Sequence, residues 1–146
     1  MTVNFRFMSV AMVLCAGTAG SAGCAPPLKE FLYCQIKGGQ KEVEVCFDDD
    51  AASYRFGLIG GRPELLLNRR IPEGARYYPW QGVGRSIAEA IEFDNQGYVY
   101  EAYGGFDRLT GADESIEASF GGIRITKDGS KVTELVCIPE TVQWSY

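Results

Sequence analysis

The sequence has 146 residues, a formal net charge of −5 and no histidine. The absence of histidine excludes Ser-His-Asp and Cys-His catalytic pairs, imidazole acid–base relays and the usual zinc sites. A chain this acidic repels phosphate backbones and anionic lipid headgroups, so we expect no nucleic-acid partner.

The N-terminus has the three parts of a secretory signal. Arg6 supplies the positive charge, residues 7–16 form an apolar run, and a stretch of small residues ending near Ala22 follows. The apolar run is too short to span a bilayer, which requires about 20 residues. We therefore predict that residues 1–22 are a signal peptide and that residues 23–146 form one domain. Loss of Arg6 changes the formal charge from −5 to −6.

Four cysteines remain once Cys15 is removed with the signal: Cys24, Cys34, Cys46 and Cys137. An even number of cysteines in an exported chain predicts two disulfides, each contributing about 2–4 kcal/mol. We therefore place the domain in the periplasm or outside the cell. Three connectivities are open to four cysteines.

An alternative concerns Cys24, because Ala22-Gly23-Cys24 is similar to the end of a bacterial lipoprotein cleavage box. The sequence departs from that box at Ser21, where leucine is usual. In this alternative, Cys24 carries a lipid, the protein is held at the outer membrane, and one of the other three thiols is unpaired. Without the lipid, we expect no membrane partner.

The first two predicted elements form a β-hairpin. Residues 31–36 are followed by a glycine pair, and residues 41–47 alternate, with Val43, Val45 and Phe47 on one face. Glu42 and Glu44 occupy the other face, which we predict to be solvated. Strands follow at residues 53–58 and 64–68, and residues 69–85 are predicted to be irregular.

Residues 86–93 allow two interpretations. Ser86 and Glu89 have the spacing of a helix capping box, with Ile87 and Ile91 one helical turn apart. The turn over residues 94–97 instead favours a hairpin into residues 98–103, and we predict a strand.

The last predicted hairpin joins residues 115–126 to residues 131–138. Asp128-Gly129 between them suits a type I′ turn, and Gly121-Gly122 predicts a bulge or sharp bend. About eight short strands and the absence of a long helical period predict an all-β domain, either an antiparallel barrel or a curved sandwich.

Strand parity bears on the disulfide pairing. Cys34 shares a strand face with aliphatic residues, whereas Cys46 shares its face with Glu42 and Glu44. A bridge between Cys34 and Cys46 is therefore awkward. We predict Cys24–Cys34 and Cys46–Cys137.

The acidic residues predict no catalytic, metal or cofactor site. Glu89 and Glu92 lie on opposite faces of a strand, so they do not converge. Asp48-Asp49-Asp50 offers oxygen ligands for calcium as an alternative, but it lacks the spacing of a dedicated calcium loop and is better explained as a charged turn. The enzyme alternative is a pair of carboxylates that only folding brings together.

The best candidate surface lies in residues 76–85, where aromatic residues and arginine cluster in a predicted loop. Such side chains anchor protein interfaces because they combine a large contact area with a polar tip. The candidate contacts are Tyr77, Tyr78, Trp80 and Arg85, and Arg55 and Arg108 are candidates to extend the surface. The structural alternative is that Tyr77 and Trp80 close one end of a barrel.

Parts of the chain resemble small exported bacterial proteins of unassigned activity. The resemblance covers most of residues 23–146, and it is carried by Tyr54-Arg55-Phe56-Gly57, Pro63-Glu64-Leu65, Gly97-Tyr98-Val99-Tyr100 and the closing hairpin 122–137. It implies no particular activity.

A second resemblance is to the periplasmic and membrane-bound inhibitors of vertebrate-type lysozyme, which are small exported antiparallel barrels. That family inserts a Ser-Gly-x-x-Tyr loop into the lysozyme cleft. The matching stretch is Gln96-Gly97-Tyr98-Val99-Tyr100, which keeps the glycine and final tyrosine but not the serine. The resemblance implies that Gly97 and Tyr100 form a second contact site.

These features predict a monomeric, exported, non-catalytic protein that occludes a protein partner. A cell-wall hydrolase or a toxin in the envelope is the expected partner, and the acidic charge suits a basic hydrolase. The alternatives are a barrel that carries a small apolar ligand and a structural envelope lipoprotein.

Overall fold

A computed structural model describes residues 23–109 and 118–145 of the chain. The predicted signal peptide, residues 1–22, lies outside the described residues, as do the first three residues of the strand predicted over 115–126.

The described chain forms two five-stranded antiparallel sheets. The first sheet has the order β10-β1-β2-β3-β4, and its strands are β1 (Lys29–Gln35), β2 (Lys41–Phe47), β3 (Ala51–Leu58), β4 (Pro63–Arg70) and β10 (Gln143–Trp144). The second has the order β5-β6-β7-β8-β9, with β5 (Ala75–Tyr78), β6 (Ser86–Asn95), β7 (Tyr98–Asp107), β8 (Ser119–Lys127) and β9 (Ser130–Val136). A 3₁₀ turn, η2 (Pro139–Thr141), precedes β10.

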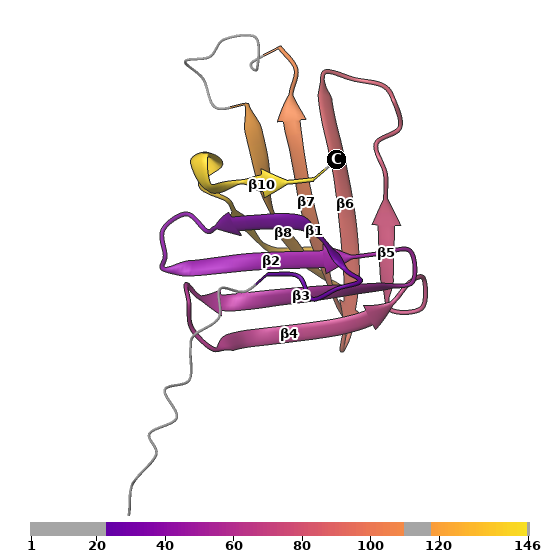
Figure 1. Ribbon diagram of the computed structural model, residues 1–146. Helices are drawn as coiled ribbons and strands as arrows, with labels where there is room; N and C mark the ends of the chain where they lie inside the picture. Colours follow the sequence, from indigo (N-terminus) through magenta and orange to yellow (C-terminus); the bar gives the residue numbers. More distant parts are fainter. Residues whose placement is uncertain (1–22, 110–117, 146) are drawn as a thin grey trace, which may run out of the picture.

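The strands of the first sheet run across those of the second, as in an orthogonal sandwich (Figure 1). The all-β prediction is confirmed, and the architecture is a sandwich of two sheets, not a closed barrel. Within residues 23–109 and 118–145, no helix is long and apolar enough to cross a membrane.

The observed strands and turns confirm some local predictions and contradict others. The strand predicted over residues 86–93 is confirmed as β6, and Asp128 and Gly129 have φ angles of 50° and 78°, as a type I′ turn requires. Of the bulge or sharp bend predicted at Gly121-Gly122, the bulge is wrong, because the pairing of β7 with β8 runs through both residues without a shift, and the bend stays a prediction. Strand β5 lies in the segment predicted to be irregular.

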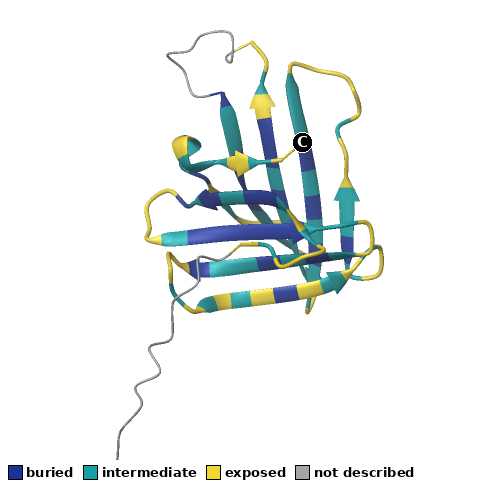
Figure 2. Cartoon of the chain, in the orientation of Figure 1, coloured by how far each residue is buried: buried dark blue, intermediate teal, exposed yellow. Residues whose placement is uncertain are grey.

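The core fills the space between the facing sides of the two sheets. Alternate residues of β3 and β6 are buried between the sheets, whereas residues 42–46 of β2 are buried on both faces, so β2 is dark blue along most of its length in Figure 2. Aromatic rings join the sheets: Tyr54 lies 5.6 Å from Phe93 and 5.7 Å from Tyr100 between ring centroids. Such pairs bury large areas and pack with specific geometry.

The prediction that Glu42 and Glu44 lie on a solvated face is wrong, since both residues are buried. Glu42 accepts hydrogen bonds from Arg55 Nη1 (3.0 Å), Tyr33 Oη (3.0 Å) and the backbone of Gly60 (3.2 Å). Burial by itself raises the pKa of Glu42, but these hydrogen bonds bring it below its ordinary value. Strand parity correctly placed Glu42 and Glu44 together on the outward face of β2. It could not show that other parts of the chain cover this face.

The first described residues, which precede β1, cross the outer side of the first sheet, where Cys24 is bonded to Cys46 (Figure 1). Glu44 lies beside this bridge, with one carboxylate oxygen 3.9 Å from Cys46 Sγ. Its other oxygen, Oε2, is buried without a hydrogen-bond partner among the described residues. Burial raises the pKa of the Glu44 carboxyl.

The predicted disulfide pairing is wrong, because the bridges are Cys24–Cys46 and Cys34–Cys137. Cys34 points into the core and meets Cys137, which follows β9, so this bridge joins the two sheets. Cys46 points to the opposite face and meets Cys24 there. The parity argument against Cys34–Cys46 therefore held, but it could not show over which face the N-terminal segment passes. The two bridges indicate an oxidising environment outside the cytoplasm.

Candidate functional site

The outward face of the second sheet is built from rows of side chains that run across all five strands. One row is charged throughout, since directly paired positions place Arg76, Glu92, Glu101, Arg124 and Glu134 side by side from β5 to β9. The adjacent row alternates large and small residues: Tyr78, Ala90, Tyr103, Gly122 and Val136. Small residues between large ones leave a depression in the face.

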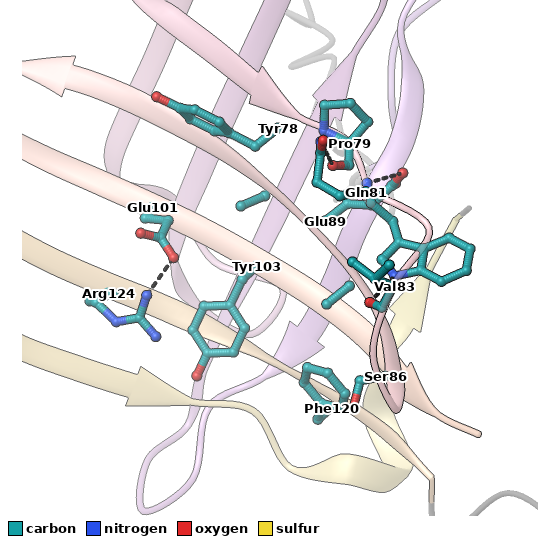
Figure 3. A pocket seen from close by; sticks show the side chains of 13 residues that line it. Tyr78, Pro79, Gln81, Val83, Ser86, Glu89, Glu101, Tyr103, Phe120 and Arg124 are labelled. Carbon is teal, nitrogen blue, oxygen red and sulfur yellow. Dashed lines mark hydrogen bonds and ion pairs between the residues drawn. The ribbon is translucent and has the colours of Figure 1, made fainter. Parts of the chain in front are cut away.

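That depression is an open groove of about 530 Å³ beside the loop that joins β5 to β6 (Figure 3). Ala88 and Ala90 of β6 form its floor. Tyr78, Pro79, Trp80, Gln81 and Val83 line it on the β5 side, Glu101, Tyr103, Phe120 and Arg124 on the β7 and β8 side, and Ser86 and Glu89 complete the lining. The groove therefore combines aromatic walls with charged groups, as interface hot spots do.

The loop wall is held in place by hydrogen bonds of the Trp80 ring and backbone. The indole Nε1 donates to the carbonyl oxygen of Val83 at 3.1 Å, and the Trp80 backbone N–H donates to Glu89 Oε1 at 3.4 Å. Gly82 and Gly84, with φ angles of 81° and 101°, supply left-handed conformations that other residues rarely adopt. The protein's own hydrogen bonds thus orient the indole ring at the edge of the groove.

Glycines in the neighbouring strands make room for the opposite wall. A Cβ at Gly122 would lie 2.5 Å from Tyr103 Oη, and a Cβ at Gly105 would lie 2.5 Å from the ring of Phe120. Each ring therefore lies over a glycine of the next strand. The sequence predicts a bulge or sharp bend at Gly122, whereas the role of both glycines here is to let aromatic side chains lie against the sheet.

Ion pairs order the charged row. Arg76 contacts both oxygens of Asp94, at 2.6 and 2.8 Å, and donates to Glu92 at 3.1 Å. Arg124 pairs with Glu101 at 2.5 Å and, more loosely, with Glu134 at 3.5 Å. The hydrogen bonds from Arg76 lower the pKa of Asp94. Burial, and then the hydrogen bond to Glu134, raises the pKa of Tyr103 to about 12.

The structure separates the residues predicted for the loop surface. Tyr78 and Trp80 line the groove, and Arg85 pairs with Asp107 at 2.7 Å next to it. The ring of Tyr77 instead turns to the core, 5.0 Å from that of Phe47. Burial, followed by the hydrogen bond to Glu89, raises the pKa of Tyr77 to about 12. Of the four predicted contacts, Tyr77 is the one that packs inward.

The arginines suggested as extensions have different outcomes. Arg108 lies over the Trp80 ring, 5.5 Å from its centroid, and donates to the carbonyl oxygen of Arg85. Arg55 lies in the first sheet, where it pairs with Glu42. Only Arg108 of these two belongs with the groove.

Gly97 and Tyr100 are not part of this groove. Gly97 lies in the turn between β6 and β7, at the end of the hairpin opposite the Trp80 loop, and has a φ of 84°. Tyr100 points inward and packs against Tyr54. The contact site implied by the lysozyme-inhibitor resemblance stays a prediction at a separate place.

Sequence reasoning missed the β7 and β8 side of the groove, namely Glu101, Tyr103, Phe120 and Arg124. The sequence nevertheless contained a feature from which Tyr103 could have been placed at the groove. The two-residue turn at Gln96-Gly97, which places Asn95 opposite Tyr98, determines that Ala90 faces Tyr103 when the register is counted back.

Across the described ranges, no group of three or more acidic or cysteine side chains is placed to hold a metal ion. Asp48 accepts hydrogen bonds from the backbone N–H groups of Asp50 and Ala51, as expected for a charged turn.

Folding does bring Glu92 opposite Glu101. A glycosidase pair needs two different environments, one apolar and one polar. Both carboxylates here belong to one ion-paired row.

No protein-family model matches the sequence, and comparisons with curated proteins and with solved structures find no match either.

Proposed function

We propose that residues 23–146 form an exported, non-catalytic binding domain that occludes a protein partner through the groove between Tyr78, Trp80 and Tyr103. The observation that carries this proposal is the groove itself, about 530 Å³ with aromatic walls held in position by the protein's own hydrogen bonds. Rigid aromatic anchors lose little conformational freedom on binding, which favours affinity.

The expected partner is a cell-wall hydrolase or a toxin that enters the envelope, and we propose the periplasm or the cell exterior as the compartment. The net charge of −6 after signal removal favours a basic partner through long-range attraction. The disulfide of Cys24 supports a domain free of lipid, because a sulfur in that bridge has no bond left for a diacylglyceryl group. The carrier alternative loses its support, since the sheets do not close into a barrel.

The test is capture of a partner from envelope extract by the mature domain, followed by assay of purified hydrolases, including a vertebrate-type lysozyme. We expect one stoichiometric partner, and we expect Trp80→Ala with Tyr78→Ala to weaken its binding about 100-fold or more. Leu66→Ala is the matched control, because Leu66 is an exposed apolar residue, 55% accessible, on the other sheet. Equal loss in both variants, or no captured partner, would refute the proposal.

A further inference from the structure

Two carboxylates of like charge lie directly opposite each other beside the groove. Glu92 of β6 pairs in register with Glu101 of β7, and both side chains point to the outward face. Opposed residues on adjacent antiparallel strands have Cβ atoms about 5 Å apart, and like charges there repel. This arrangement favours any cation that can approach both groups.

In each of these two carboxylates, only one oxygen accepts hydrogen bonds from the described part of the protein. Glu92 Oε2 accepts from Tyr78 Oη (2.9 Å) and Arg76 Nε (3.1 Å), on the β5 side. Glu101 Oε1 accepts from Arg124 Nη1 (2.5 Å), on the β8 side. Among the described residues, no hydrogen bond is found for Glu92 Oε1 or Glu101 Oε2. Each carboxylate thus keeps one oxygen that can accept from a ligand.

The cations beside this pair are shared with other carboxylates. Arg76 contacts Asp94 as well as Glu92, and Arg124 contacts Glu134 as well as Glu101. Among the described residues, neither Glu92 nor Glu101 therefore has a cation to itself. A cationic ligand is therefore complementary to this part of the face, and an anionic ligand is not.

The groove beside the pair accommodates a long, flexible stem. Ala90 is the next outward residue of β6 after Glu92, and Ala88 follows, so no large side chain of β6 rises from the floor. Tyr78 and Trp80 flank this strip. Long cationic side chains lay their methylene groups along such apolar surface and extend their charged head to carboxylates.

We infer that the groove receives an arginine side chain of the protein partner, with its guanidinium between Glu92 and Glu101 and its methylene stem over Ala90 and Ala88. Arginine fits better than lysine because its planar fork offers several N–H donors in fixed directions and can bridge two acceptor groups. This inference rests on the proposed function, since it names the chemistry by which a partner enters the same groove.

The probes are three blocked tripeptides, acetyl-Gly-X-Gly-amide, in which X is arginine, lysine or citrulline. Citrulline has the shape of arginine with a neutral urea in place of the guanidinium. The readout is the amide chemical shifts of the labelled mature domain during titration to about 20 mM peptide, a range that covers weak millimolar binding. We expect saturable shifts at Ala88 and Ala90 with the arginine peptide, weaker binding of lysine, and at least about fivefold weaker binding of citrulline.

Two kinds of variant sharpen the test. Glu101→Gln and Glu92→Gln each remove one charge and should weaken binding of the arginine peptide about fivefold. Ala90→Leu leaves every charge in place but fills the floor, and it should abolish the shifts. Glu64→Gln, at an exposed carboxylate of the first sheet, is the control and should bind as the parent does. Thermal unfolding of each variant establishes that it is folded.

Equal binding of the arginine and citrulline peptides, shifts that map away from β6 and β7, or no binding of any peptide would overturn the inference. These outcomes differ from failure of the proposed function. If Trp80→Ala prevents partner capture while the peptides do not bind, the groove binds its partner by other chemistry. If the arginine peptide binds but partner capture does not depend on Trp80, the occluding function is wrong.

Discussion

The outward faces of both sheets carry pairs of glutamate and arginine, but the two pairs differ in how far they are exposed to solvent. On the first sheet, Glu42, Arg55 and Tyr33 form a network that is largely covered, with only 7% of the Glu42 side chain and 17% of the Arg55 side chain accessible. On the second sheet, Glu101 and Arg124 form an ion pair beside an open groove, with 27% and 40% of their side chains accessible. Burial decides which of these ion pairs contributes more to stability, and the accessible pair is the one that our proposal assigns to recognition.

The largest effect is expected when the covered pair is broken. Arg55→Met leaves the Glu42 carboxylate buried with two of its three hydrogen-bond donors, and the domain should lose about 3 kcal/mol of unfolding free energy in urea. The double variant Arg55→Met with Glu42→Met removes the charge as well and should regain most of that loss. If the single variant is as stable as the parent, the covered network is not structural.

A smaller, pH-dependent effect is expected at Glu44. Burial raises the pKa of Glu44, nearby Glu30 and Glu42 add to this, and Arg55 opposes it. In the unfolded chain the carboxyl ionises near its ordinary pKa of 4.5, while the folded domain retains the proton to higher pH. The folded state therefore loses stability as the pH rises from about 4.5 through the raised pKa.

Glu44→Gln removes this titration. Relative to the parent, it should gain about 1 kcal/mol more at pH 7 than at pH 4, as measured by urea unfolding at both values. Glu140→Gln, at an exposed position of the 3₁₀ turn, should show no such difference. A gain that is equal at both pH values would contradict the assignment to Glu44 ionisation.

The smallest effect on stability is expected for the exposed pair of the second sheet. Arg124→Met should change the unfolding free energy by less than about 1 kcal/mol, because an exposed ion pair gains little over solvated charges. A loss as large as that of Arg55→Met would remove the distinction between the two faces. Urea unfolding of both variants under the same conditions makes the comparison direct.

Local sequence patterns predicted most of the strands and several turns. The alternation in residues 41–47 and the dipeptide Asp128-Gly129 depend on neighbours along the chain, and both predictions are confirmed. Strand β5 was missed because its four residues lie among proline, glycine and aromatic residues that are typical of loops. For the groove, the cluster of aromatic residues in 76–85 identified Tyr78 and Trp80. It did not identify Tyr103, because Tyr103 lies on the next strand and is brought to the groove only by its pairing with Ala90 across the hairpin.

The sequence by itself determined the backbone periodicity, the faces of individual strands and the number of cysteines available for bridges. Those properties depend on chain stereochemistry and on residues only a few positions apart. Only the tertiary structure decided that Glu42 and Glu44 are covered, that Cys24 meets Cys46, and that Glu92 lies beside a groove. A period of two shows which side chains share a face, but what lies against that face depends on segments distant in the chain.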